Sequence, residues 1–166
     1  LFSDYAERYG LTVNRVSLEP SSNIALPLFS EAHRLLEMDI DLEVQDDDDN
    51  EDEGEEQRDL LAEMELTARL MITGGEAKED EKMSRADRSA IRQAILLAAE
   101  KTSQETPPRQ VLTGDVKAAL EELSRRQDIR PERASRLADM AEAMGIFCTG
   151  VNGRFFNREG EIWPEA

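Results

Sequence analysis

The stretch Asp46–Glu56 places the strongest constraint on how this chain can fold. Its eleven residues include nine carboxylates and no apolar side chain. Because like charges at this density repel one another, residues 46–57 are predicted to form a solvated, disordered acidic loop. This loop would separate a short mixed region, residues 1–45, from a long helical region.

The acidic run also accounts for most of the net charge of −17. From Glu37 to Asp59 there are fourteen acidic residues and one basic residue, so this window carries −13 and the rest of the chain only −4. The body is therefore predicted to be a mildly acidic domain. Direct nucleic-acid binding is not expected, because neutralising phosphates requires a surplus of Lys and Arg.

The chain offers few side chains for chemistry. Cys148 is the single cysteine, and its apolar neighbours favour a buried, inert thiol over a nucleophile. The single histidine, His33, is expected to be a surface or packing residue. Aligning a calcium-binding loop on Gly54 puts Leu60 where a bidentate Glu is required, so no EF-hand is predicted.

Other signatures of catalysis are missing from the sequence. Neither phosphate-binding glycine motif, G-x-x-x-x-G-K-[ST] or G-x-G-x-x-G, occurs, and no G-x-S-x-G elbow occurs. Acidic pairs such as Glu63 with Glu65, and Glu121 with Glu122, are interpreted as solvated helix faces. The sequence therefore predicts no catalytic, cofactor-binding or metal-binding residue, and no apolar stretch approaches the roughly 18 residues of a membrane span.

Residues 1–45 are predicted to be an α/β flank. Phe2–Tyr9 has helical spacing, and Leu11–Leu18 alternates with β-branched residues as a strand does. Ile24–Phe29 is predicted to be extended and partly buried, before a helix capped by Ser30. The alternation of apolar and acidic residues in Met38–Val44 indicates either an edge strand or the frayed end of that helix.

Residues 58–145 are predicted to form a helical bundle, because four apolar stripes at helical spacing are joined by short polar loops. The stripes include Leu61 and Ala68; Ile91, Ala94 and Ile95; Val116, Ala119 and Leu120; Leu137 and Ala141. The methionines on these stripes are interpreted as core filler rather than as a ligand groove. They are Met64, Met71, Met140 and Met144.

Local signals mark where these helices begin and end. Ser84 with Asp87 forms a capping box, and Thr113 is the predicted N-cap of the following helix. Pro131 fits a first helical position, and Gly145 is expected to cap the last helix. The segment Glu76–Lys82 is interpreted as a charged linker.

Residues 146–166 are predicted to be a short β meander, with turns at Asn152-Gly153 and Asn157–Gly160. The expected fold class is therefore mainly α, a helical bundle flanked by short β segments at both ends. The opening at Leu1 and the close after a Trp-Pro pair suggest a fragment of a longer protein.

The opening LFSDYAERYGLTVNRVSLEP and the close GIFCTGVNGRFFNREGEIWPEA resemble the conjugative-transfer ATPases of type IV secretion systems, the TraC-like motor proteins. In that family a helical insertion interrupts a RecA-like nucleotide-binding core. The resemblance implies that this chain lies between the Walker A and Walker B motifs, with Arg58 to Gly145 as the insertion. The segment Asn23–Phe29 looks like the family's Asn-Pro-Phe-type stretch in a different order.

The resemblance carries over no catalytic residue, because both nucleotide motifs lie outside this chain. It implies ATP and Mg as cofactors of the parent protein, whose ATP hydrolysis powers pilus assembly and DNA transfer at the cytoplasmic face of the inner membrane. The implied partners are the rest of the same ATPase chain, other secretion-system proteins and further copies in a homo-oligomer. The expected role of this segment is packing, protomer contact and coupling of ATP hydrolysis.

A second interpretation belongs to a different functional class. The chain could be a free-standing helical adaptor or regulatory domain that binds a basic protein partner through its acidic loop.

Overall fold

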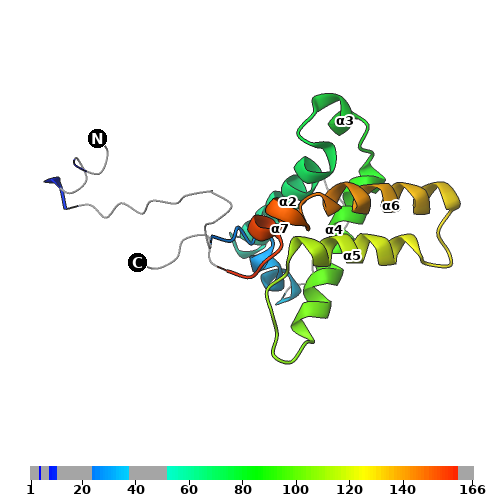
Figure 1. Ribbon diagram of the computed structural model, residues 1–166. Helices are drawn as coiled ribbons and strands as arrows, with labels where there is room; N and C mark the ends of the chain where they lie inside the picture. The colour runs from blue at the N-terminus through cyan, green and yellow to red at the C-terminus, as the bar shows by residue number, and fades with distance from the viewer. Residues whose placement is uncertain (1–3, 5–7, 11–23, 38–51, 161–166) are drawn as a thin grey trace.

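The structure is a computed structural model that describes residue 4 and residues 8–10, 24–37 and 52–160, with side chains from residue 58 in the last range. Its elements follow in the order η1 (Ser30–Glu37, a 3-10 helix), α2 (Asp52–Thr73), α3 (Ala77–Glu81), α4 (Arg85–Ser103), α5 (Thr113–Ser124), α6 (Pro131–Gly145) and α7 (Gly150–Phe156) (Figure 1). No helix among the described residues is long and apolar enough to cross a membrane.

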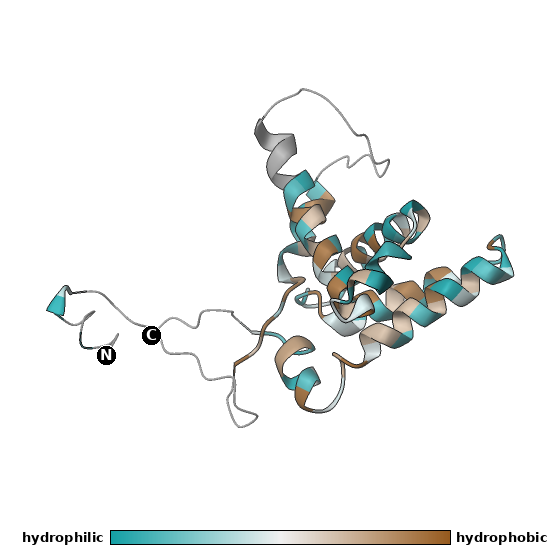
Figure 2. Cartoon of the chain, turned by 90° about the horizontal axis from the view of Figure 1, so that it is seen from above, coloured by the Kyte–Doolittle hydropathy of each residue, from teal (hydrophilic) through white to brown (hydrophobic). Residues whose placement is uncertain are grey.

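Helix α4 is the centre of the bundle. It packs against α5, α2 and η1, while α6 lies along α5 and also reaches α2. Its apolar face is the most buried of the fold, and Ile91, Ala94 and Ile95 are fully shielded from solvent. The long helices alternate between hydrophobic and hydrophilic sides, as amphipathic helices around a shared core must (Figure 2).

The predicted helical bundle is confirmed, and so is the role of its methionines. All four methionine side chains of the predicted stripes belong to one continuous core, in which they fill the space between α2, α4 and α6. They are Met64, Met71, Met140 and Met144.

Two of the predicted helix starts are confirmed by their geometry. The Ser84 hydroxyl accepts a hydrogen bond from the Asp87 amide at 3.1 Å, and the Asp87 carboxylate accepts one from the Ser84 amide at 3.1 Å. This is the reciprocal capping box that the sequence predicts. Pro131 occupies the first position of α6, where its missing N–H costs nothing.

Helix α5 begins differently from the prediction. Its N-cap is Leu112, whose amide donates to the Asp115 carboxylate at 2.8 Å. Thr113, the predicted cap, is already helical, and its hydroxyl donates to the carbonyl of Phe156 at 2.7 Å rather than capping α5. Gly145 likewise is the last helical residue of α6, and Ile146 is the cap.

The predicted β meander over residues 146–166 is wrong where the structure describes it. Residues Gly150–Phe156 form helix α7, and no strand occurs among the described residues. Gly153, expected in a turn, donates from its amide to Thr149 at 2.9 Å. A Cβ at Gly153 would lie 2.6 Å from the Cys148 carbonyl oxygen, so this glycine serves a close backbone approach.

The remaining predictions for the flanks have mixed outcomes. The strand expected over Leu11–Leu18 lies outside the described residues, and so does Met38–Val44, the predicted edge strand or frayed helix end. The helix expected after Ser30 is present as η1 and includes Ser30 itself. Helix α2 starts at Asp52, inside the predicted acidic loop, which is consistent with the preference for acidic residues in a first helical turn. The predicted charged linker Glu76–Lys82 contains α3.

The most important correction concerns Glu65 on α2. The sequence places this residue on a solvated helix face, yet it is only 2% exposed. Its carboxylate accepts hydrogen bonds from two arginines of α4, Arg88 at 2.7 Å and Arg92. Arg69 of α2 lies 3.9 Å away and also forms a bidentate pair with Asp80 of α3. The buried Glu65 carboxylate thus ties α2 to α4, and Arg69 extends the network to α3.

A second buried carboxylate, Asp87, connects α4 to α6. It accepts from Arg133 and, at 3.2 Å, from Arg136, in addition to the capping bond from Ser84. Burial by itself would raise the pKa of Asp87. The Arg133 and Ser84 hydrogen bonds and the charge of Arg136 outweigh that cost, so the pKa lies below its ordinary value of 3.8.

The two acidic residues of α2 offer a matched pair of variants. Glu65→Gln removes the charge from a buried site and leaves the α4 arginines without a counter-ion, so the free energy of unfolding should fall by about 3 kcal/mol. Glu63→Gln, on the exposed side of the same helix, should change it by less than about 0.5 kcal/mol. Urea denaturation followed by circular dichroism measures both. Equal losses would contradict the assigned role of Glu65.

The lowered pKa of Asp87 predicts how stability depends on pH. The carboxylate contributes stability that is fully present above its unfolded-state pKa, near 4, and is lost as the pH falls through the lower folded-state value. Unfolding free energies of the wild type and of Asp87→Asn should therefore differ most near neutral pH and converge below about pH 4. A difference that stays constant down to pH 2 would show that the carboxylate is not ionised in the fold.

Candidate functional site: the junction at the base of the bundle

Two segments far apart in the sequence meet at one end of the bundle. The incoming segment, residues 24–29, and the outgoing segment, residues 155–160, are together called the junction below. The Leu26 amide donates to the Phe155 carbonyl at 2.6 Å. A Cβ at Gly160 would lie 2.7 Å from the Cβ of Ala25, so only glycine permits this approach. The chain therefore enters and leaves the bundle at the same place (Figure 1).

The incoming segment is anchored by burial and by one polar contact. Phe29 is fully buried, and Ala32 and Leu35 of η1 continue the same apolar contact with the core. On η1, His33 Nε2 lies 2.7 Å from the Thr102 hydroxyl of α4. That hydroxyl donates to the Ala98 carbonyl at 2.9 Å, so the histidine nitrogen is assigned as the donor. The prediction of His33 as a packing residue is confirmed.

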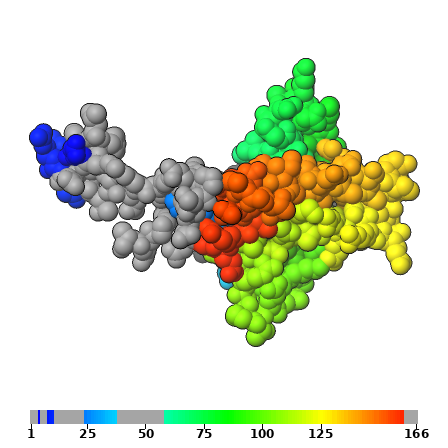
Figure 3. Space-filling model, viewed as in Figure 1, coloured from blue at the N-terminus to red at the C-terminus, as the bar shows by residue number. Residues whose placement is uncertain are grey.

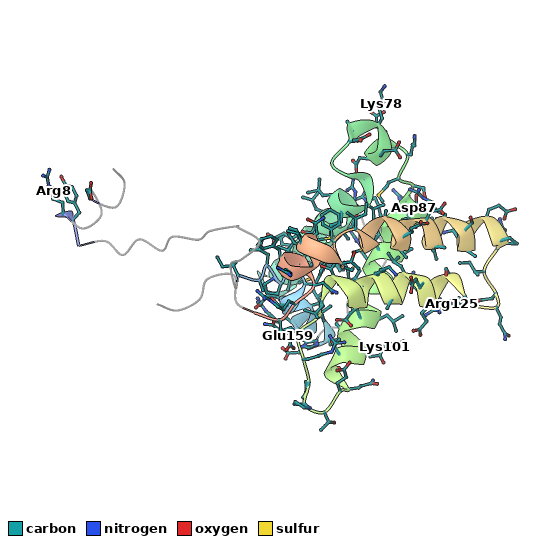
Figure 4. The ribbon with its side chains drawn as sticks, in the orientation of Figure 1. Arg8, Lys78, Asp87, Lys101, Arg125 and Glu159 are labelled. Carbon is teal, nitrogen blue, oxygen red and sulfur yellow. The ribbon has the colours of Figure 1, made fainter. Side chains whose placement is uncertain are left out.

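The outgoing segment is held by the loop between α4 and α5. The side chain of Gln110 bonds the Gly160 backbone in both directions, donating to its carbonyl at 3.1 Å and accepting from its amide at 2.9 Å. The Gln110 amide also donates to the Glu159 carboxylate at 3.0 Å. Figure 4 shows Glu159 at this end of the molecule.

Asn157 makes the second connection between the outgoing segment and the bundle. Its carbonyl oxygen accepts from the Gly114 amide at 2.8 Å, at the start of α5. Its NH₂ group donates to the Cys148 carbonyl at 3.2 Å. The bond from Gly114 supplies a partner for a free amide of the α5 N-terminus, and the Thr113 hydroxyl adds a second contact by donating to the Phe156 carbonyl. The predicted turn residue is thus a clamp between α5, α7 and the chain leaving them.

The loop that carries Gln110 is itself held rigidly. Arg109 forms a bidentate pair with Asp115, with nitrogen–oxygen distances of 2.6 and 2.7 Å. The Asp115 hydrogen bonds raise the pKa of Arg109 above its ordinary value. The same carboxylate caps α5, so the helix start and the loop before it form one unit.

Aromatic side chains and the single thiol complete the junction. Phe156 contacts Phe147 edge to face at 5.6 Å between ring centres, and both pack against the core. Cys148 is half-buried rather than buried, and its thiol donates to the Met144 carbonyl at 3.5 Å. Burial raises the pKa of this thiol, which disfavours the reactive thiolate at neutral pH.

The polar groups of the junction bind backbone atoms of neighbouring segments and so hold the outgoing segment against the bundle. No group of His, Cys, Asp and Glu side chains suited to a metal occurs within the described parts of the chain. The sequence contained no local signal for Gln110 or Gly160, because their contact spans fifty positions. Comparisons with protein-family models, with curated proteins and with solved structures find no match for this chain.

Substitutions of two glutamines test whether Gln110 holds the outgoing segment against the bundle. Gln110→Ala removes both side-chain bonds to Gly160, so amide hydrogen exchange at Gly160 should accelerate and the free energy of unfolding should fall by about 1 kcal/mol. Gln127→Ala, at an exposed position between α5 and α6, should change neither quantity measurably. Exchange at Gly160 is read by nuclear magnetic resonance. Unchanged hydrogen exchange at Gly160 in the Gln110→Ala variant would show that Gln110 does not hold the outgoing segment.

Proposed function

We propose that this chain is the segment of a TraC-like conjugative motor ATPase between its two nucleotide motifs, with Arg58 to Gly145 as the helical insertion, and that it serves packing, protomer contact and coupling rather than catalysis. The observation that carries the proposal is the junction. A bundle whose incoming and outgoing segments share a hydrogen bond, Leu26 to Phe155, can interrupt another fold at a single point without distorting it. The parent motor is proposed to act at the cytoplasmic face of the inner membrane.

The contacts inside the bundle support a role in coupling. A displacement of the incoming segment reaches α4 through His33 and Thr102, and a displacement of the outgoing segment reaches α5 through Asn157 and Gly114. Buried ion pairs at Glu65 and Asp87 join α4 to α2 and α6. Movement imposed at the junction is therefore expected to turn the bundle as one body.

Exposed apolar side chains support contact with a further protein surface. Leu66 and Leu70 lie one turn apart on α2, and each is 52% exposed. Ile146, directly after α6, and Val151, in the first turn of α7, are also exposed. Single exposed apolar residues are common, but a pair on one helix face suits packing against a neighbouring protomer or the proposed ATPase core.

Nucleotide binding tests the non-catalytic role. Isothermal titration calorimetry of this chain with ATP and Mg should show no binding in the micromolar range, because the chain contains no glycine-rich phosphate loop. The same titration of the longer parent protein should show binding. Micromolar binding or hydrolysis of ATP by this chain alone would contradict the proposal.

The open reading frame that contains this sequence distinguishes the proposed motor ATPase from the free-standing adaptor. The proposal requires a P-loop motif upstream of Leu1 and an apolar strand ending in Asp or Glu downstream of Ala166. A start codon close to Leu1 would instead favour the free-standing adaptor that binds a basic partner through its acidic loop.

A further inference from the structure

A cavity of about 360 Å³ lies between α4, the end of α5 and the start of α6. Its apolar lining includes Ala90, Leu123 and Leu137, and its polar lining includes Ser89, Gln93 and Arg126. The cavity is at the end of the bundle away from the junction. Figure 3 shows the α5–α6 connection projecting there, away from α7 and the outgoing segment.

Arginines concentrate around this cavity although the whole chain carries −17. Between residues 124 and 136 there are five arginines and only two acidic residues. Arg133 and Arg136 are neutralised by Asp87. Arg125, Arg126 and Arg130 form no ion pair with any residue that the structure describes, and Arg125 is seen near the end of α5 in Figure 4. Of these three, Arg126 lines the cavity, so its guanidinium group remains available to a ligand there.

The combination of an apolar floor with the Arg126 guanidinium restricts the class of ligand. A guanidinium binds a carboxylate in a planar, bidentate geometry, and the apolar floor gains from burying an aliphatic side chain. A phosphodiester backbone would leave this floor without an apolar partner. Asp128 also lines the cavity, and its negative charge would repel a ligand that carries many closely spaced anionic groups. These features together favour carboxylates interleaved with apolar side chains.

The net charge of the chain does not prevent such binding. The window from Glu37 to Asp59 carries −13, so the rest of the chain carries only −4. Within that rest, residues 124–136 carry more arginines than acidic residues, so the local charge there is positive.

We propose that this cavity docks an acidic segment of a partner protein, with a carboxylate of the segment on Arg126 and a neighbouring aliphatic side chain on the floor formed by Ala90, Leu123 and Leu137. The inference rests on the cavity alone and does not require the motor function proposed above.

The test is fluorescence anisotropy of the full chain with a fluorescein-labelled peptide in which glutamate and leucine alternate. Arg126→Gln should weaken binding about tenfold, as expected when a charge-assisted hydrogen bond is lost. Arg125→Gln removes the same charge from the next residue, which does not line the cavity, and should weaken binding less than about twofold. Ala86→Trp, on the exposed side of the cavity wall, should block the site.

Changes in the peptide separate a docking site from a charged surface. Replacing leucine by serine in the peptide should weaken binding at least about tenfold, because the apolar floor then has no partner. Equal effects of Arg125→Gln and Arg126→Gln would show charge attraction without a site and would overturn the proposal. It would also be overturned by failure of the wild type to bind the peptide. Tighter binding of a labelled oligonucleotide, with the same dependence on Arg126, would replace it with a phosphate site.

Discussion

The bundle depends on the burial of the Glu65 carboxylate against the arginines of α4. Removing a charged group from water is costly, and it is tolerated only where opposite charges and hydrogen bonds compensate for the lost solvation. Arg88 and Arg92 supply that compensation from successive turns of α4. Because the carboxylate must meet both side chains, α2 can lie on α4 in only one register. An apolar contact alone would permit neighbouring registers at little cost, since hydrophobic attraction is not directional.

Asp87 applies the same constraint on the other side of α4. Its carboxylate caps the helix and also receives Arg133 and Arg136, so the start of α4 and the first turns of α6 are positioned together. This arrangement uses two of the arginines near the α5–α6 connection and leaves Arg125, Arg126 and Arg130 for other contacts. The ion pairs that hold the fold thus also determine which charges its surface presents. The junction lies at one end of this rigid unit and the arginine-lined cavity at the other.

The sequence predicted the helical core well because that core follows local rules. The apolar stripes, the Ser84–Asp87 capping box and Pro131 each act within a few residues of chain, and all three features are present. It failed at α7, where Asn152-Gly153 has the composition of a turn. There the chain is helical because Gly153 fits against the Cys148 carbonyl and Phe156 packs on Phe147. Tertiary contact outweighed local preference.

Composition and periodicity by themselves determined that this chain forms amphipathic helices around a methionine-containing core and that its charge is concentrated in one acidic window. They could not distinguish Glu63 from Glu65, because both are acidic residues on the same predicted helix. Only the tertiary structure decided that one faces water and the other faces Arg88 and Arg92. It alone brought residues 24–29 to residues 155–160 and Gln110 to Gly160. The physical reason is that these contacts join positions far apart in the chain, whereas sequence periodicity reports only on neighbouring turns of a helix.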